Sequence, residues 1–379
     1  MDIIFIICSL LFIFALIFHN TSYSEENNAT GYDDSILVIE VFDDDEEESK
    51  YELKETVAIN AVLRASKICQ KVFQKLVMSD TVIKKDRSPV TVADFSAQAV
   101  VNKILYETFP NDLIVGEEES GCLQGDNRKE LKNKVLSLAN SVLDTPLNDN
   151  ELLDTINRGS SPGGSSGRIW ALDPIDGTKG FLRGEQFCIG LALIIDRDVH
   201  LGVLGCPNLL VDLKTPEGEK GCLFVAIKGK GAFQHKFSST EETQIHLADI
   251  SSPSAALFCE SVVAEHSSHG DAAKIASFLG ITKPPLHMDS MCKYCVVARG
   301  DADIYLSLPV RVDYEENIWD HAAGCILIKE AGGIVSDINN KPLDFSLGRT
   351  LKTNKGVVVA HSKIHGQVID VVQQLILKK

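Results

Sequence analysis

The sequence has no surplus of positive charge. Its 37 lysine and arginine residues stand against 53 aspartate and glutamate residues, so 37 − 53 gives a formal net charge of −16. Proteins that bind nucleic acid usually carry a basic stripe or patch, and this balance argues against such a surface. An acidic protein can still bind an anion if local cations or a bound metal ion supply the attraction.

Positive charge is also missing in front of the N-terminal hydrophobic run, residues 3–18. A helix of this length would extend about 24 Å, which is short for a membrane span. The run is typical of a signal peptide cleaved after Ser24, but without a positive region before it an uncleaved signal anchor is an alternative. We therefore expect residues 1–24 to direct the chain to the secretory pathway or an endomembrane lumen and to provide its only membrane contact. A misassigned start codon would instead leave a cytoplasmic protein.

A disulfide framework is not favoured, although the chain contains ten cysteines. The chain is long, and most of its cysteines lie in apolar segments, as Cys188, Cys206 and Cys325 do. Buried free thiols are therefore expected. The CxxC pair Cys292 and Cys295 has neither a thioredoxin-like context nor a second pair for zinc, so we interpret it as part of the packing.

A chain of 379 residues exceeds the usual size of one hydrophobic core. We expect an acidic linker over residues 25–50, folded structure from about Tyr51, and a first amphipathic helix over 58–77. The following part, up to residue 242, is predicted as an α+β domain (51–242) with antiparallel strands and a polar excursion or mobile loop with some helix over 120–160. Strands and helices then alternate over 243–379, which predicts an α/β domain.

Two aspartates lie three residues apart in WALDPIDGTKGF, residues 170–181. The strand expected over 169–172 would place Asp173 at its carboxyl end, where open α/β sheets have their sites. A proline turn would return Asp176 to the same side, with the carbonyl of Ile175 between them. These oxygens suit Mg²⁺, although the pattern alone also fits a surface turn with two solvated acids.

Two further acids lie at the ends of predicted elements. Glu117 follows the strand in DLIVGEEES, and Asp320 lies at the start of a helix in IWDHAAG. Each alone is a weak signal, since the first could be a surface acid and the second a helix N-cap. Together with Asp173 and Asp176 they could hold two or three divalent ions that bind a phosphoryl group and activate a water.

Three motifs in order, VGEEES, WALDPIDGTKGF and WDHAAGCILIKEAGG, resemble the signatures of the inositol monophosphatase superfamily, which are lithium-sensitive, Mg²⁺-dependent phosphatases. EHSSH, DSMCKY and the stretch from Gly163 to Ile194, with its Lys179-Gly180, are similar to the 3'(2'),5'-bisphosphate nucleotidase branch. The resemblance covers about residues 51–379. It implies a two-domain layered αβαβα sandwich, with α/β and α+β halves and the site in the cleft between them.

The resemblance also implies a role for each matching residue. Asp94 and the Thr178 hydroxyl would orient and deprotonate the attacking water. The metal ligands would be Glu117, Asp173, the Ile175 carbonyl, Asp176 and Asp320. The amides of Gly177 and Thr178, a predicted helix start, would hold the scissile phosphate. The remaining substrate contacts would be His266, Ser290, Lys293 and Asp320, with Lys293 at the 5'-phosphate.

One departure bears on the nucleotide pocket. Related enzymes often have arginine at the position of Ser307, so a cation is missing there, and Arg311 is a nearby substitute. We expect a monomeric phosphatase that converts adenosine 3',5'-bisphosphate (PAP) to AMP and phosphate, and also the sulfate-activated form (PAPS) to APS, with Mg²⁺ as cofactor and Li⁺ as inhibitor. The alternatives are an inositol polyphosphate 1-phosphatase, a dual-specificity enzyme, or a catalytically silent nucleotide-binding protein.

Overall fold

The computed structural model describes residues 44–74, 81–83, 89–263, 268–309 and 314–377. Within the chain, residues 48–379 form one compact unit. The predicted signal segment, 1–24, and most of the predicted linker lie outside the described residues, as do His266 and Arg311.

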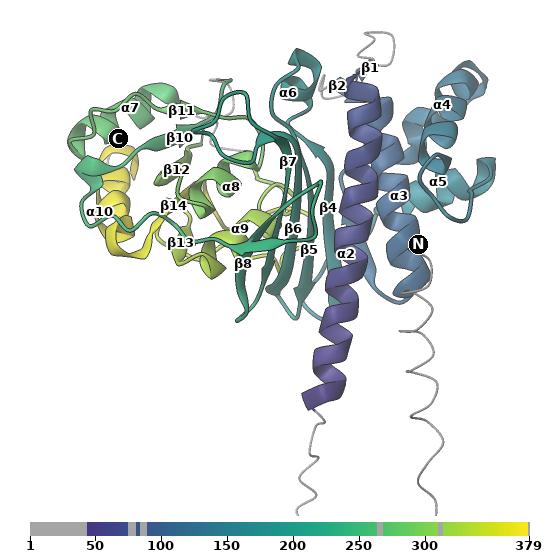
Figure 1. Cartoon of the computed structure of the whole chain (residues 1–379), viewed down its shortest axis with the longest axis horizontal. Helices are drawn as coiled ribbons and strands as arrows, with labels where there is room; N and C mark the ends of the chain where they lie inside the picture. Colours follow the sequence, from purple (N-terminus) through teal and green to yellow (C-terminus); the bar gives the residue numbers. More distant parts are fainter. Residues whose placement is uncertain (1–43, 75–80, 84–88, 264–267, 310–313, 378–379) are drawn as a thin grey trace, which may run out of the picture. The chain divides into compact units, whose positions relative to one another are not determined.

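Helices make up both ends of the unit and its middle layer (Figure 1). Their bounds are α2 Asp44–Phe73, α3 Val92–Thr108, α4 Lys129–Asn140, α5 Asp149–Asn157, α6 Thr178–Arg183, α7 His269–Phe278, α8 Cys292–Ala298, α9 Ala322–Glu330 and α10 Ser362–Val372. Short helical turns are η2 Ser120–Leu123, η3 Asp126–Arg128, η4 Pro253–Ala255 and η6 Gln373–Leu377.

The described strands form two large sheets and one small hairpin. A seven-stranded sheet has the order β3-β4-β5-β6-β7-β8-β9, and a five-stranded sheet has the order β11-β10-β12-β14-β13. The bounds are β1 Thr81–Ile83, β2 Pro89–Thr91, β3 Leu113–Gly116, β4 Arg168–Asp176, β5 Cys188–Ile195, β6 Asp198–Leu210, β7 Lys220–Ile227, β8 Gly231–Lys236, β9 Glu242–Gln244, β10 Phe258–Glu260, β11 Leu286–His287, β12 Ile304–Ser307, β13 Gly333–Ser336 and β14 Val357–His361.

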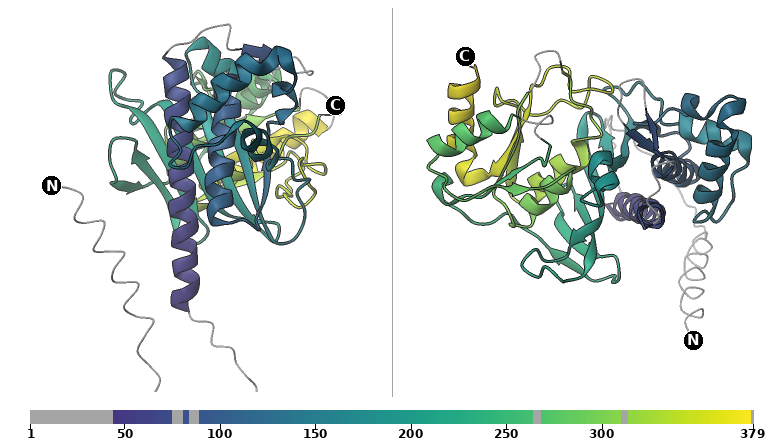
Figure 2. Two further views of the ribbon diagram at one scale, coloured as in Figure 1. Left: turned by 90° about the vertical axis from the view of Figure 1, so that its right-hand side faces the viewer. Right: turned by 90° about the horizontal axis from the view of Figure 1, so that it is seen from above.

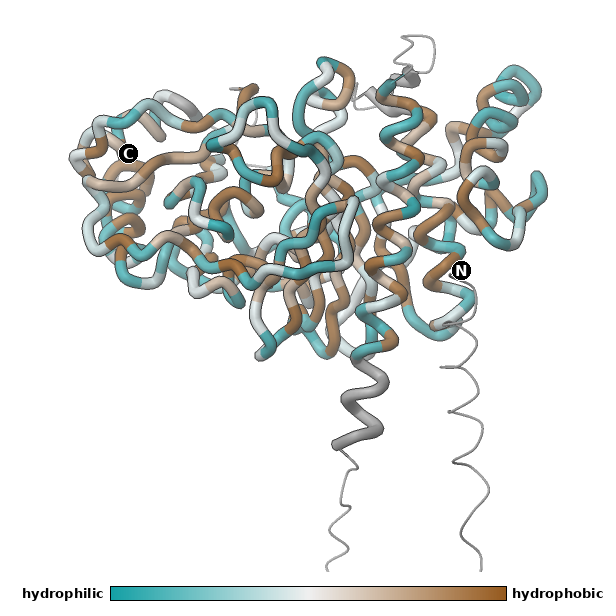
Figure 3. The backbone as a smooth tube through the Cα atoms, viewed as in Figure 1, coloured by the Kyte–Doolittle hydropathy of each residue, from teal (hydrophilic) through white to brown (hydrophobic). Residues whose placement is uncertain are grey.

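Helices cover both faces of the seven-stranded sheet, so its central strands are apolar on both sides (Figure 3). In β4, Trp170 and Leu172 belong to a core shared with α2 and α3, whereas Ile169 and Ala171 belong to a core shared with α8 and α9. This alternation follows from the two-residue period of a strand. Figure 2 shows α2 and α3 on the same face of the sheet.

A third core lies between the five-stranded sheet and the helices α7 and α10. Strands β10, β11 and β12 pair in parallel, and β14 pairs antiparallel with both β12 and β13. The successive layers are therefore helices, sheet, helices, sheet and helices. This arrangement confirms the predicted layered αβαβα sandwich.

Close packing between layers depends on glycines in β6. A Cβ atom on Gly202 would lie 2.8 Å from the carbonyl oxygen of Ala323 in α9, and one on Gly205 would lie 2.7 Å from Cγ1 of Val62 in α2. Both distances are too short for a side chain, so β6 approaches a helix closely on each of its faces. The seven-stranded sheet therefore holds α9, which follows Asp320, in a defined position.

Some boundaries differ from the sequence-based prediction. The first helix begins at Asp44, inside the predicted linker, and ends at Phe73 rather than at residue 77. The helical part expected within the excursion 120–160 is present as α4 and α5, which pack leucine and valine side chains against α3. The two large sheets separate after β9, close to residue 243, but residues 48–379 form one compact unit, so the two-domain division remains a prediction.

Nine cysteines of the described residues are free thiols, and eight of them are buried. The CxxC cysteines have different partners: Cys292 Sγ lies 3.5 Å from the Phe187 carbonyl oxygen, and Cys295 Sγ lies 3.6 Å from Cys206 Sγ. Burial raises the pKa of the Cys292 and Cys295 thiols, which disfavours reactive thiolates. No helix among the described residues is long and apolar enough to cross a membrane.

Candidate active site

A bulge in β4 brings Asp173 and Asp176 together. Residues three apart on a regular strand point to opposite faces of a sheet. Here Asp173 pairs with Gly190 of β5 and Asp176 pairs with Cys188, so three steps along β4 match two along β5. The extra residue turns the second carboxylate back to the side of the first. The strand thus continues through Asp176, beyond the end predicted at residue 172.

Asp320 completes a cluster of three carboxylates. One side-chain oxygen each of Asp173, Asp176 and Asp320 lies within 4.8 Å of the others. Asp320 is in the turn just before α9 rather than inside the helix, and Asn317 Nδ2 donates to its Oδ2 at 3.2 Å. The motifs at residues 173–176 and at 320 are therefore brought together, as the sequence motifs predicted.

Burial and mutual repulsion keep these acids from ionising readily. Burial raises the pKa of Asp176 to about 6 and that of Asp320 to about 7. It also raises the pKa of Asp173 well above its usual range, helped by the charges of Glu117, Asp176, Asp320 and Asp94. Such repulsion between carboxylates is relieved when a cation lies between them.

Glu117 is positioned by a glutamine in α3. The side chain of Gln98 donates to the Glu118 carbonyl at 2.6 Å and accepts from the Glu118 amide at 2.9 Å. It also donates to the Ile156 carbonyl at 3.0 Å, which ties this turn to α5. The charge of Glu117 raises the pKa of all three clustered aspartates, so its carboxylate lies within electrostatic range of each.

Asp94 and Thr178 approach the cluster from two other helices. Asp94 is in the first turn of α3 and only 1% exposed, and its charge acts on Asp173. Thr178 begins α6, which contacts β2 just before α3. The Thr178 hydroxyl donates to the Ile175 carbonyl at 3.2 Å. The predicted water-activating residues and the predicted carbonyl ligand thus lie around the same carboxylates.

Most of the predicted nucleotide contacts lie beside this cluster, on the segment before and within α8. The Met291 amide donates to Asp176 Oδ2. A Cβ atom on Gly177 would be 2.9 Å from Cβ of Ser290, so these two residues are in direct contact. Lys293 is 7% exposed, its Nζ is 5.4 Å from the Tyr305 ring centroid, and its charge lowers the pKa of Asp176 against the effect of burial.

Ser307 is buried at the end of β12 within a polar network. Its hydroxyl donates to Glu316 Oε1 at 3.4 Å, and Glu316 Oε2 lies 3.5 Å from Nε2 of His321. The other His321 nitrogen, Nδ1, is 2.8 Å from the Tyr294 hydroxyl. Burial opposes the charge on His321, but the hydrogen bond and charge of Glu316 outweigh it and raise its pKa. Ser307 therefore adjoins a carboxylate–histidine pair, Glu316 and His321, whose histidine lies next to Asp320 in the sequence.

Several supporting residues were not predicted from the sequence. Arg183 forms an ion pair with the buried Asp289, next to Ser290. Gln98 and Arg349 act on backbone carbonyls rather than on side chains. No sequence signal marks such contacts, because a backbone carbonyl leaves the identity of the partner residue open.

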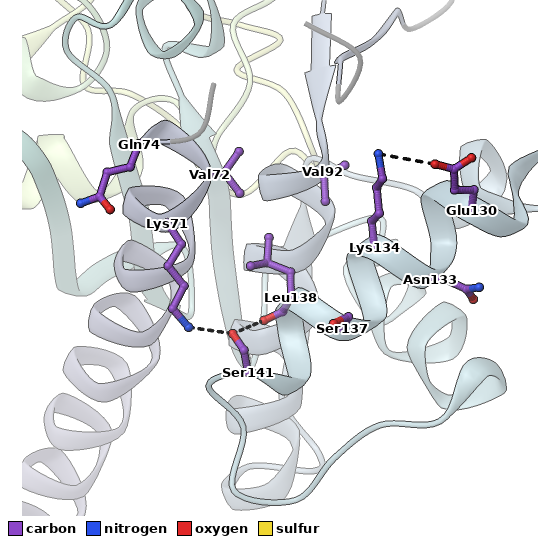
Figure 4. Close-up of a pocket in the computed structure, with 10 residues that line it drawn as sticks. All are labelled: Lys71, Val72, Gln74, Val92, Glu130, Asn133, Lys134, Ser137, Leu138 and Ser141. Carbon is purple, nitrogen blue, oxygen red and sulfur yellow. Dashed lines mark hydrogen bonds and ion pairs between the residues drawn. The ribbon is translucent and has the colours of Figure 1, made fainter. Parts of the chain in front are cut away.

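A cavity of about 710 Å³ lies elsewhere, between the ends of α2 and α3 and the helix α4 (Figure 4). Lys71 donates across it to Ser141 at 2.9 Å, and Lys134 pairs with Glu130 at 3.7 Å within α4. None of the clustered acids lines this cavity. It is therefore distinct from the candidate active site.

The carboxylate cluster fits a hard divalent cation. Oδ1 of Asp173 is fully buried and accepts no hydrogen bond from the described residues, so its lone pairs are available. The donors at hand are all oxygen atoms: the three aspartates, Glu117 and the Ile175 carbonyl. Magnesium prefers this donor set, whereas zinc and copper prefer sulfur and nitrogen.

Metal binding should depend on pH. The folded pKa values of Asp176 and Asp320 lie above the 3.8 of an unperturbed aspartate, so the metal-free fold binds protons that the unfolded chain has lost. Its stability should therefore fall as pH rises from about 4 to about 7, while metal, which needs the ionised forms, should bind better. We expect Mg²⁺ to raise Tm more at about pH 8 than at about pH 6. Thermal melts with Mg²⁺ and with EDTA measure this; an equal or larger shift at the lower pH would contradict it.

The chain was compared with known proteins. Residues 51–377 match the model of the inositol monophosphatase family. The chain is 44% identical over 334 residues to the 3'(2'),5'-bisphosphate nucleotidase of Schizosaccharomyces pombe, with 84% of this chain and 95% of the relative covered. It is 40% identical over 346 residues to 3'(2'),5'-bisphosphate nucleotidase 1 of Arabidopsis thaliana, with 87% and 98% covered.

Solved structures show the same fold at lower identity. The structure of inositol monophosphatase from Anabaena matches with a TM-score of 0.56 at 20% identity, covering 86% of this chain and 97% of that one. The family model, the relatives and the fold agree with the family that the sequence motifs indicated. The chain belongs to the inositol monophosphatase family, in the branch of the 3'(2'),5'-bisphosphate nucleotidases.

Proposed function

We propose that this protein is a Mg²⁺-dependent phosphatase that hydrolyses the 3'-phosphate of PAP to give AMP and phosphate, and that it also accepts PAPS. The observation that carries the proposal is the cluster of the buried Asp173 with the half-buried Asp176 and Asp320, with Lys293 beside it. Names of relatives at 44% identity support the same substrate class. A carboxylate cluster alone repels phosphate, so the substrate and the cation are expected to bind together.

Different residues of the site are proposed to activate the water and to hold the phosphate. Bound Mg²⁺ would neutralise charge on the phosphate and make water more acidic. The carboxylate of Asp94 accepts a proton from the attacking water, and the Thr178 hydroxyl orients that water. The water oxygen forms a bond to phosphorus while the bond to the 3'-oxygen breaks, and the 3'-oxygen takes up a proton from solvent. The amides of Gly177 and Thr178 hold the phosphate oxygens.

Lys293 is proposed to select for a second phosphate. A charge-assisted contact to a 5'-phosphate contributes ~2 kcal/mol, or about 30-fold in kcat/KM. An inositol monophosphate lacks the second phosphate. Ser307 supplies no second cation, so discrimination is proposed to rest on Lys293.

A phosphate-release assay tests the substrate. With Mg²⁺, we expect kcat/KM for PAP to exceed that for inositol 1-phosphate by about 30-fold or more, with turnover lost in EDTA and reduced by Li⁺.

Lys293→Met should lower kcat/KM for PAP by about 30-fold and affect kcat/KM for inositol 1-phosphate much less. Lys228→Met, which removes an exposed lysine paired with Asp198, is the control.

Two outcomes would replace the proposal. Preference for inositol 1,4-bisphosphate over PAP would indicate an inositol polyphosphate 1-phosphatase or a dual-specificity enzyme. Binding of PAP without phosphate release, with Mg²⁺ present, would indicate a nucleotide-binding protein. PAPS is included as a separate substrate, and no release from it would remove only that part of the proposal.

A further inference from the structure

Arg349 joins two segments that are distant in sequence. It lies in the connection between β13 and β14, and its guanidinium donates to three backbone carbonyls. Nη2 bonds the Gly116 oxygen at 2.6 Å, and Nη1 bonds the Gly159 and Ser161 oxygens at 3.0 Å each. The planar guanidinium presents several donors in fixed directions, which allows one side chain to hold three acceptors.

The three carbonyls belong to the backbone that supports Glu117. Gly116 is the last residue of β3 and directly precedes Glu117. Its amide donates to the Gly159 carbonyl at 2.8 Å, and the Ser161 amide donates to the Ile114 carbonyl at 3.2 Å. Arg349 thus binds the end of this short ladder, at the point where the chain leaves the sheet toward Glu117.

The same arginine also contacts the segment that supports Asp320. Its guanidinium carbon lies 4.8 Å from the ring centroid of Trp319, the residue before Asp320. The backbone of this region is paired as well: the Ile318 amide donates to the Arg349 carbonyl at 3.0 Å, and the Leu351 amide donates to the Glu316 carbonyl at 2.8 Å. The Arg349 side chain therefore stacks on Trp319, in the segment that carries Asp320, and donates hydrogen bonds to the segment that carries Glu117.

We propose that Arg349 is a positioning residue of the metal site, which fixes the spacing between Glu117 and Asp320 by holding the residue before each of them. The inference rests on the proposed metal-dependent function. Burial lowers the pKa of Arg349, and the nearby charges of Glu119 and Glu117 oppose this effect. Arg349 is half-buried and its hydrogen bonds go to neutral carbonyls rather than to a carboxylate, which favours a role that needs its geometry.

The chain contains a matched control in Arg299. The side chain of this arginine is 5% exposed and thus more deeply buried than Arg349; its Nη1 donates to the carbonyls of Leu210 and Val211 at 2.9 and 3.2 Å, and it pairs with Asp301. It touches none of the segments that carry the predicted metal ligands. Arg299→Met therefore removes a similar number of buried hydrogen bonds without reaching the metal site.

The test measures Mn²⁺ binding calorimetrically on the full chain without nucleotide, together with Tm in EDTA. Arg349→Met, which keeps packing on Trp319, should raise the Kd for Mn²⁺ by about 10- to 100-fold. Arg349→Lys should recover little, because one ammonium group cannot hold all three carbonyls. Arg299→Met should lower Tm and leave the Kd for Mn²⁺ within about 3-fold of the parent value. This margin is smaller than the change expected for Arg349→Met.

A Kd for Arg349→Met equal to that of the parent, or a change no larger than that in Arg299→Met, would overturn the inference. If Arg349→Met lacks the near-UV circular dichroism of a folded protein, Arg349→Lys decides, and a parent-like Kd in that variant overturns it. A parent protein that binds Mn²⁺ but hydrolyses no PAP would reject the proposed function, while weaker binding in the Arg349 variants would still support the inference. A parent that binds no Mn²⁺ overturns both.

Discussion

Replacing Asp94 by asparagine should lower kcat for phosphate release from PAP by about 100- to 10,000-fold, the range by which a positioned general base accelerates reactions. Asparagine keeps the shape of the side chain in the first turn of α3, where Asp94 is 1% exposed, but it cannot accept the proton of the water. The Kd for Mn²⁺ should change little, because Asp94 is not one of the three clustered carboxylates.

Steady-state kinetics and calorimetry on Asp94→Asn measure both quantities. Glu107→Gln, near the other end of the same helix, removes an exposed carboxylate paired with Lys103 at 3.0 Å and should leave kcat unchanged. Full activity of Asp94→Asn would show that another group accepts the proton. Loss of metal binding together with activity would make Asp94 a ligand instead of a base.

Replacing Asp173 by asparagine should stabilise the metal-free protein and abolish its activity. Burial and four neighbouring acids disfavour the Asp173 carboxylate, and its Oδ1 accepts no hydrogen bond from the described residues. A neutral amide removes that repulsion, so Tm in EDTA should rise by a few degrees near neutral pH. The same change removes a ligand from the cluster, so kcat should fall by at least about 100-fold.

Asp337 is the control for the effect of replacing a buried aspartate by asparagine on Tm and activity. It is also fully buried, but its Oδ1 accepts from the Asn339 and Lys341 amides at 2.9 Å each, and its Oδ2 accepts from Asn354 Nδ2 at 3.3 Å and from the Lys355 amide at 3.4 Å, hydrogen bonds that the NH₂ group of asparagine could not accept. Asp337→Asn should therefore lower Tm and leave the metal site intact. Melting curves in EDTA compare the two variants directly. A lower Tm in Asp173→Asn would mean that this carboxylate is stabilised in the metal-free fold.

The carboxylates of the site could be predicted from the sequence because each lies in a local motif. WALDPIDGTKGF contains two of them, and the strand before it and the proline within it mark their place in the fold. The β4 bulge that turns Asp176 to the same side depends on pairing with β5, which no local pattern specifies. The nucleotide-side residues Ser290 and Lys293 were predicted only through the resemblance.

Other features were missed for different physical reasons. The contact of Arg349 with Gly116 spans 233 residues and uses a backbone oxygen, so the identity of the partner residue leaves no trace in the sequence. The start of α5 could have been found, because Asn148 and Glu151 form a capping box in NDNE. The start of α2 at Asp44 could not, since its first residues are acidic and resemble a solvated linker.

The long separation between Gly116 and Arg349 has a consequence for the order of folding. Domains generally fold as units during synthesis, at about 5–20 residues per second. The strand that ends at Gly116 is synthesised early. The Gly116 carbonyl cannot accept its hydrogen bond from Arg349 until that arginine has been synthesised, more than 200 residues later. A nascent chain that has already formed the seven-stranded sheet therefore carries Glu117 and both aspartates of β4 without their fixed spacing to Asp320. In the positioning role that we propose for Arg349, the metal-binding geometry would be complete only after the connection before the last strand, β14, has been synthesised and has packed against Gly116.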